Sequence, residues 1–136
     1  MILSYSKLIT LPTFVERYRY LKQSGRVGEE TFGSHRYLNQ VLYTSSEWRH
    51  TRNEIIIRDN GCDLGMEGFE LSGRIYIHHI NPITVDDVLN RNPCVFDPDN
   101  LICVSDATHK AIHFGDESML PINYYSQREP GDTILW

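Results

Sequence analysis

The sequence predicts one α+β domain, in which a helical N-terminal segment precedes two short strands and a closing helix. Apolar residues recur at helical spacing over roughly the first 60 residues of the 136-residue chain. Two later runs, 74–80 and 101–104, are rich in β-branched residues and are bounded by turn formers, as strands are. With 40% hydrophobic and 23% charged residues, a chain of this length can bury the core of a single domain, residues 1–136.

Three helices are predicted in the first half. Thr13 and Glu16 form the pattern of a capping box, and apolar residues at helical spacing extend this first helix to a stop at Gly25. A second helix is predicted from about residue 34. A third starts at residue 45 or 46 and ends at Asp59-Asn60-Gly61, where Asn or Gly can adopt the left-handed cap. Residues 1–45 are therefore expected to form a helical extension.

The second half is predicted to run strand, loop, strand and helix. Some twenty residues with three prolines separate the strands, and loops of this length are usually functional or disordered. Thr84 can cap one helical turn inside this loop. Ser105 is the predicted N-cap of the last helix, which Gly115 closes, and residues 116–136 are expected to form an irregular tail.

The net charge of −5 and the pI near 5.6 argue against nucleic-acid binding, but the charge is unevenly distributed. Residues 1–58 hold nine Lys or Arg and five Asp or Glu, a balance of +4, whereas residues 59–136 hold four and thirteen, a balance of −9. Such asymmetry indicates a nucleic-acid face or, equally, acids on solvated loops and around a cation. Alternating arginines and tyrosines between residues 17 and 43 leave a similar choice between a nucleic-acid surface and ordinary amphipathic helices.

The sequence argues against a membrane protein and against a secreted one. The chain has no apolar run near the roughly 18 residues that a membrane span needs. Its first residues lack the charged, apolar and small-residue zones of a signal peptide. The three cysteines, Cys62, Cys94 and Cys103, do not make a disulfide framework because their number is odd. We therefore expect a cytoplasmic protein with no membrane partner.

Four of the six histidines fall in two clusters. His109 and His113 are four residues apart on one predicted helix, so both imidazoles share a face and can bind one metal ion. His78 and His79 end the first predicted strand, where neighbours point to opposite faces unless the strand ends or bends. Either pair alone is as readily explained by histidines that serve as ordinary polar residues and bind nothing. The two pairs combine with Asn100, which lies twenty-one residues after His79 and nine before His109, into a more specific pattern.

This order resembles the HNH endonuclease family, with its ββα-metal motif, and in particular the small HNH proteins of bacteriophages. The resemblance covers about residues 46–113 and rests on residues 77–80, 99–102 and 108–113, with a lead-in at Trp48-Arg49, Arg52 and Arg58-Asp59. It implies an HNH core over residues 46–115, after the helical extension and before the tail. By its residue type alone, Trp48 is expected in the core rather than on a base-stacking platform.

The resemblance assigns a role to each residue of the pattern. His79 is expected to be the general base that deprotonates water, and Asn100 to orient its ring through a carbonyl. His78, His109 and His113 are expected to hold one divalent metal ion, for which Zn, Ni, Co, Mn and Mg are the candidates. Imidazole titrates near neutrality, as a base for this reaction must. Nitrogen ligands suit Zn, Ni, Co or Mn better than Mg or Ca.

The sequence departs from the family where many members carry two CxxC pairs that hold a structural zinc. The first pair is reduced to Cys62-Asp63-Leu64-Gly65, and Ser105 and Thr108 stand where the second would fall. No structural zinc is therefore expected, and packing should hold the lead-in segment instead. Cys62 and Cys103 are expected to be buried apolar residues.

The expected function is metal-dependent nicking or cleavage of double-stranded DNA with low sequence specificity, since phosphate contacts alone cannot identify bases. Arg74, Lys110 and Arg52 are candidate phosphate contacts, although each can equally be an ordinary surface charge. We also expect residues 17–58 to form a basic wall along the DNA groove.

Two alternatives remain open at the level of the sequence. One is a non-catalytic, metal-stabilised accessory module of a phage DNA-processing machine, which would need neither His79 nor Asn100. The other is an RNA substrate. The resemblance further implies a phage terminase or another phage protein as partner, in the cytoplasm of a bacterial host.

Overall fold

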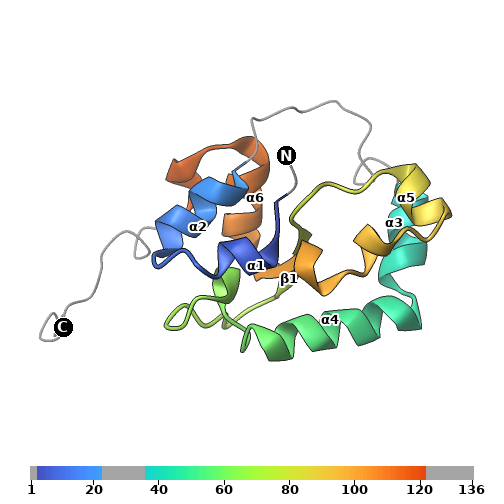
Figure 1. Ribbon diagram of the computed structural model, residues 1–136, viewed down its shortest axis with the longest axis horizontal. Helices are drawn as coiled ribbons and strands as arrows, with labels where there is room; N and C mark the ends of the chain where they lie inside the picture. The colour runs from blue at the N-terminus through green and yellow to red at the C-terminus, as the bar shows by residue number, and fades with distance from the viewer. Residues whose placement is uncertain (1–2, 23–35, 122–136) are drawn as a thin grey trace, which may run out of the picture.

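The computed structural model describes residues 3–22 and 36–121. These residues form six α-helices, short 3-10 turns and one two-stranded antiparallel sheet, so the α+β class is confirmed (Figure 1). No helix within these two ranges is long and apolar enough to cross a membrane.

Two helices of the N-terminal segment lie next to the last helix of the chain. Helix α1 (Tyr5–Leu8) was not predicted, because four residues are too few for a periodic pattern. Helix α2 (Phe14–Leu21) begins at the predicted cap, where the Thr13 side chain accepts from the backbone N–H of Glu16. Its predicted stop at Gly25 lies outside the described residues.

The next two helices precede the sheet. Helix α3 (Arg36–Tyr43) agrees with the second predicted helix, whose start near residue 34 is outside the described residues. Helix α4 (Ser46–Arg58) has the predicted boundaries, with Ser45 as N-cap and Asp59 as C-cap. Asn60 and Gly61 then take the left-handed conformation, with φ of 52° and 63°.

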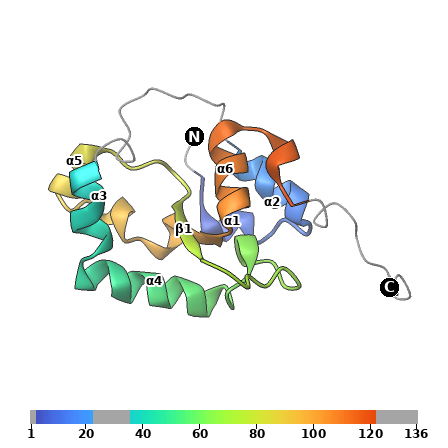
Figure 2. The same cartoon turned by 180° about the vertical axis from the view of Figure 1, so that it is seen from behind.

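The sheet is a hairpin of β1 (Tyr76–His79) and β2 (Leu101–Val104). Its register pairs His78 with Ile102 and His79 with Leu101. Alternate residues of β2 therefore enter different apolar clusters. Ile102 packs in a cluster with residues of α2 and α6, and Leu101 in a cluster with residues of α4 and the inter-strand loop. Figures 1 and 2 show α4 below the hairpin and α6 above it.

The loop between the strands contains one short helix, α5 (Val85–Leu89), and the 3-10 turns η3 (Pro93–Val95) and η4 (Pro98–Asn100). Thr84 and Asp87 form a reciprocal capping box at the start of α5, so the predicted helical turn is confirmed.

Helix α6 (Asp106–Phe114) follows β2 directly. Ser105 caps it and Gly115 closes it at φ 67°, as the sequence predicts. The tail is less irregular than expected at its start, because η5 (Glu117–Met119) follows and Leu120 is buried in the core. Residues 122–136 of the expected tail lie outside the described part.

A buried hydrogen-bond cluster stands where the sequence lacks the cysteine pairs. Asp63, in the turn η2 (Asp63–Gly65), is fully buried and accepts the Thr108 hydroxyl at 2.6 Å and the Ser105 backbone N–H at 3.2 Å. These bonds join the lead-in segment to the start of α6. The expected packing of the lead-in segment therefore includes a buried hydrogen-bond cluster. Cys62 and Cys103 are buried, as predicted.

Candidate metal centre

Three histidines from two elements converge on one point. His78 lies on β1, and His109 and His113 lie one turn apart on α6. One ring nitrogen from each of the three lies within 4.8 Å of the others. The ring centroids of His78 are 5.3 Å from His109 and 5.2 Å from His113, and those of His109 and His113 are 4.4 Å apart. The structure thus brings together the three predicted ligands, and this group can hold a metal ion.

An unpartnered nitrogen supports this assignment. The His78 side chain is 2% exposed, and its Nε2 is the one fully buried side-chain polar atom without a hydrogen-bond partner in the described part of the chain. Leaving such an atom unsatisfied costs about 1–3 kcal/mol. A cation at the centre of the three rings would remove that cost.

The electrostatics also favour the ligand form of the imidazoles. Burial, followed by the neighbouring His109 and His113, lowers the pKa of His78 well below its usual value. Burial and the nearby His113 lower the pKa of His109 to about 4, and burial lowers the pKa of His113. Neutral imidazoles offer the lone pairs that a metal requires. Since the group contains no carboxylate, it fits Zn, Ni, Co or Mn better than Mg.

His79 occupies a separate position at the end of β1. Its ring stacks on the indole of Trp48, with 5.4 Å between centroids and 22° between planes. Trp48 is 4% exposed, so it belongs to the core, as expected, and also contacts the proposed base. His79 lies close enough to the cluster to lower the pKa of His78 and of His109.

A backbone carbonyl fixes the tautomer of His79. Nε2 lies 3.0 Å from the carbonyl oxygen of Val95. A carbonyl can only accept, so Nε2 carries the proton and Nδ1 keeps the lone pair. Burial lowers the pKa of His79 to about 4, an effect that the Val95 carbonyl partly offsets. The ring is therefore neutral and oriented, but with this pKa it is a weaker base than the near-neutral imidazole expected from the sequence.

The predicted hydrogen bond from the His79 ring to a carbonyl of Asn100 is not present, because Nε2 bonds the Val95 carbonyl instead. The Asn100 side chain points into the inter-strand loop, where Oδ1 accepts from Asn81 and Nδ2 donates to the carbonyl of Cys94 at 2.9 Å. Asn100 therefore holds the residue before Val95 and not the ring itself. Sequence reasoning missed Val95 because it acts through its backbone, and it interpreted Asn81 only as the end of a strand.

The three candidate phosphate contacts differ in their surroundings. Arg74 is exposed, with its guanidinium carbon 5.1 Å from the ring centroid of Tyr76, and Tyr76 stacks on His109 at 5.8 Å. Lys110 is exposed on α6 and pairs with Asp106 at 2.9 Å. Arg52 donates to the carbonyl of Ile75 and so supports the backbone before β1. Arg74 and Lys110 therefore flank the centre, whereas Arg52 has a structural contact.

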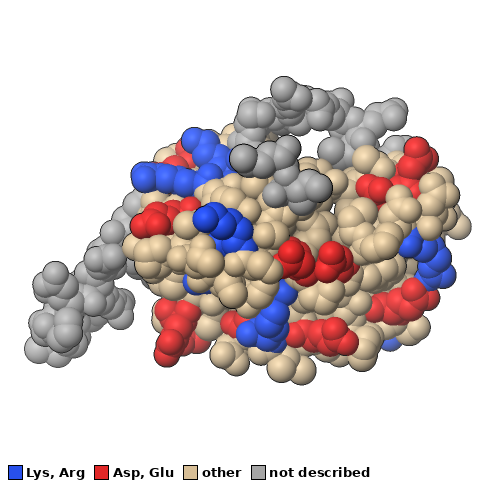
Figure 3. All heavy atoms as spheres, in the orientation of Figure 1, with Lys and Arg blue, Asp and Glu red and all other residues tan. Residues whose placement is uncertain are grey.

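The predicted basic wall over residues 17–58 is wrong as a continuous surface. Arg17 is buried and donates to three backbone carbonyls, and Arg19 pairs with Glu117 at 2.9 Å. Arg58 pairs with Asp59 and donates to the carbonyls of Pro98 and Leu101. Arg17 and Arg58 therefore direct their guanidinium groups to backbone and carboxylate oxygens, and Arg19, although exposed, has its charge paired. On the face in Figure 3, Lys and Arg are interspersed with Asp and Glu.

Of the remaining members of the wall, Arg49 is exposed on α4. Arg26 and the side chain of Arg36 lie outside the described residues.

Comparisons of the chain with protein-family models, with curated proteins and with solved structures found no match in any of the three. What the protein does must therefore be inferred from the geometry of its own residues.

Proposed function

We propose that this protein is a metal-dependent endonuclease of the HNH type that hydrolyses phosphodiester bonds of DNA. One observation carries the proposal. Three imidazoles converge on a strand–strand–helix frame beside a fourth, His79, which is neutral and held in a single tautomer. A module that only binds metal needs the three ligands but has no need of the fourth ring.

The hydrolysis requires a base, a positive charge and a held substrate. Nδ1 of His79 accepts a proton from the attacking water, and the Val95 carbonyl, still bonded to Nε2–H, stabilises the imidazolium that forms. His78, His109 and His113 would hold a divalent ion, which supplies charge that offsets the charge growing on the phosphate and the leaving oxygen. Trp48 shields one face of the base and limits its rotation.

Substrate binding would rely on phosphate contacts. Arg74 and Lys110 are the exposed cations beside the centre, and neither is placed to identify bases. We therefore propose double-stranded DNA as the substrate, with low sequence specificity unless a partner supplies it. A phage DNA-packaging or processing machine is the setting that the HNH resemblance suggests.

A plasmid-relaxation assay with a panel of divalent metals tests the proposal. The parent protein should nick or linearise plasmid with at least one of Zn, Ni, Co or Mn, and His79→Ala should reduce the rate at least ~100-fold. His50→Ala is the matched control, because His50 is an exposed histidine on α4 that pairs with Glu54. A parent protein that binds metal and cuts neither DNA nor RNA would favour the accessory-module alternative.

A further inference from the structure

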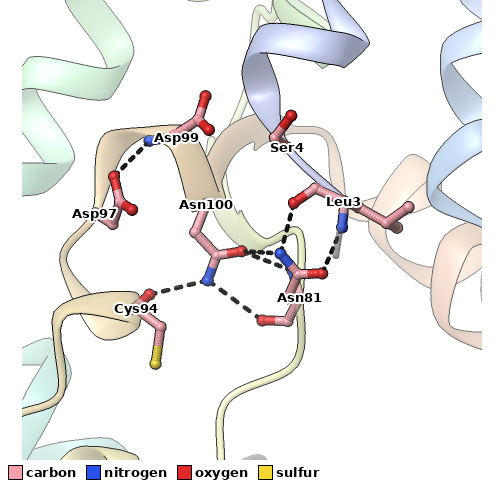
Figure 4. A pocket seen from close by; sticks show the side chains of 7 residues that line it. All are labelled: Leu3, Ser4, Asn81, Cys94, Asp97, Asp99 and Asn100. Carbon is pink, nitrogen blue, oxygen red and sulfur yellow. Dashed lines mark hydrogen bonds between the residues drawn. The ribbon is translucent and has the colours of Figure 1, made fainter. Parts of the chain in front are cut away.

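The side chain of Asn81 joins the N-terminal segment to the hairpin. Its Oδ1 accepts the backbone N–H of Leu3 at 2.9 Å, and its Nδ2 donates to the backbone carbonyl of Leu3 at 2.7 Å (Figure 4). Leu3 precedes α1, whereas Asn81 lies two residues beyond the end of β1. The side-chain amide therefore bonds both backbone groups of Leu3, its N–H and its carbonyl, as a residue of a paired strand does.

Asn81 also contacts the start of β2 through Asn100. Its backbone N–H and its Nδ2 both donate to Asn100 Oδ1, at 2.8 and 2.9 Å. Asn100 returns a bond from Nδ2 to the Asn81 carbonyl at 3.3 Å and donates to the Cys94 carbonyl at 2.9 Å. Figure 4 shows the two amides facing one another between the N-terminal segment and the loop. Both donors of the Asn81 amide and its acceptor are therefore used.

The bond to Cys94 carries this network to the active-site region. Cys94 precedes Val95, whose carbonyl accepts from Nε2 of His79. The loop has a second tie to the N-terminal segment, because the backbone N–H and the hydroxyl of Ser6 both donate to Oδ1 of Asp99. The path from Asn81 to the His79 ring therefore runs through three residues, Asn100, Cys94 and Val95, by hydrogen bonds and by the peptide link between Cys94 and Val95.

We propose that Asn81 is a positioning residue for His79. Together with Leu3 and Asn100 it holds the loop whose Val95 carbonyl fixes the tautomer and the aim of the base. The N-terminal segment is then part of the catalytic apparatus, although it supplies no atom to the metal cluster. This inference rests on the proposed function, in which His79 is the base.

Asn81→Asp is the sharpest test, because the carboxylate has the size of the amide but cannot donate. It would face the Leu3 carbonyl and Asn100 Oδ1, two acceptors, across distances now spanned by hydrogen bonds. Asn81→Ala is a second and milder variant, since it removes the bonds without adding repulsion. Asn53→Ala is the control, because Asn53 is an exposed asparagine on α4, outside the inter-strand loop.

If Asn81 only stabilised the fold, replacing it would leave the tautomer of His79 unchanged. The tautomer of His79 is therefore the decisive measurement. Long-range proton–nitrogen NMR on the zinc-loaded protein should show a single Nε2–H form of His79 in the parent and in Asn53→Ala. In both Asn81 variants it should show exchange between the two tautomers. With plasmid as substrate, kcat should fall about tenfold or more while KM and zinc affinity stay within about threefold.

Each outcome decides something separate. A single Nε2–H form and a parental kcat in a folded Asn81→Asp or Asn81→Ala protein would overturn the positioning role. If the parent itself cuts no nucleic acid, the proposed function fails, but the tautomer measurement still decides whether Asn81 orients the ring. Should Asn81→Asp fail to fold, Asn81→Ala supplies the same two readouts.

Discussion

The indole of Trp48 and the imidazole of His79 lie nearly parallel, with 5.4 Å between their centroids and 22° between their planes. Trp48 is itself held by an edge contact from Tyr43 at 5.1 Å and by Phe96 at 6.4 Å. Helix α4 therefore supports the ring that we propose as the base, on the face of the hairpin opposite to α6.

Replacing Trp48 should lower the catalytic rate as well as the stability of the fold. Trp48→Ala should lower the free energy of unfolding by about 3–5 kcal/mol and reduce kcat, because the ring loses its packing surface. Trp48→Phe keeps an aromatic face, so it should cost less and retain most of the activity. Denaturant unfolding and plasmid nicking, measured on the same preparations, separate the two effects. Equal kcat in folded Ala and Phe variants would contradict a role for the indole in holding His79.

Zinc should stabilise the protein through the three-histidine cluster. At a free zinc concentration 100 times the Kd, the expected gain is about 2.7 kcal/mol in the free energy of unfolding. Thermal melting with and without zinc measures it. His113→Ala should abolish most of the gain because it removes one of the three ligands. His113 is exposed, so its replacement should cost the metal-free fold little packing energy. His35 is outside the described residues, so His50→Ala is again the control and should keep the full gain.

The Asp63 cluster should stabilise the fold without metal. Asp63→Ala leaves the Thr108 hydroxyl and the Ser105 N–H without their acceptor, which should lower the free energy of unfolding by about 2 kcal/mol or more. Thr108→Val removes one bond with little change of volume and should cost less. Urea denaturation measures both changes. Elemental analysis of the parent should give one zinc per chain, and a second tightly bound zinc would contradict the replacement of the cysteine pairs by this cluster.

Arg74 should contribute to DNA binding, whereas buried Arg17 should not. Arg74 is exposed, makes no ion pair among the described residues and lies on the Tyr76 ring beside His109. On a His79→Ala background, Arg74→Gln should reduce the slope of log affinity against log salt by about one. Arg17→Met should instead lower stability, because Arg17 donates to carbonyls of Leu11, Leu64 and Ile9. Fluorescence anisotropy at several salt concentrations tests both, and an unchanged slope for Arg74→Gln would remove it from the DNA contacts.

The sequence predicted well those features that depend on local patterns. Helices α4 and α6 follow from their caps, and the hairpin follows from two runs of β-branched residues between turn formers. The three ligands could be predicted because a strand end and an i, i+4 pair are each local. Their convergence was expected only from the HNH resemblance, because periodicity along the chain does not indicate how a strand and a helix face one another.

The missed features depend on long-range contacts or on backbone atoms. Val95 orients His79 through a carbonyl, which every residue type possesses. Asn81 acts on Leu3 across 78 positions of sequence. The predicted basic wall was wrong because spacing along the chain does not tell an exposed arginine from one such as Arg17, whose guanidinium ends among buried carbonyls.

The hairpin divides its two adjacent histidines between two apolar clusters. His78 pairs with Ile102 on the side of α6, and His79 pairs with Leu101 on the side of α4. The proposed ligand and the proposed base therefore lie against different apolar clusters. If the cluster around Trp48 opened alone, the proposed base would be released while the three proposed ligands kept their positions. Under the proposed function, metal occupancy would then overstate the competent fraction of a preparation, and a titration of active sites would be needed to count the molecules that cleave.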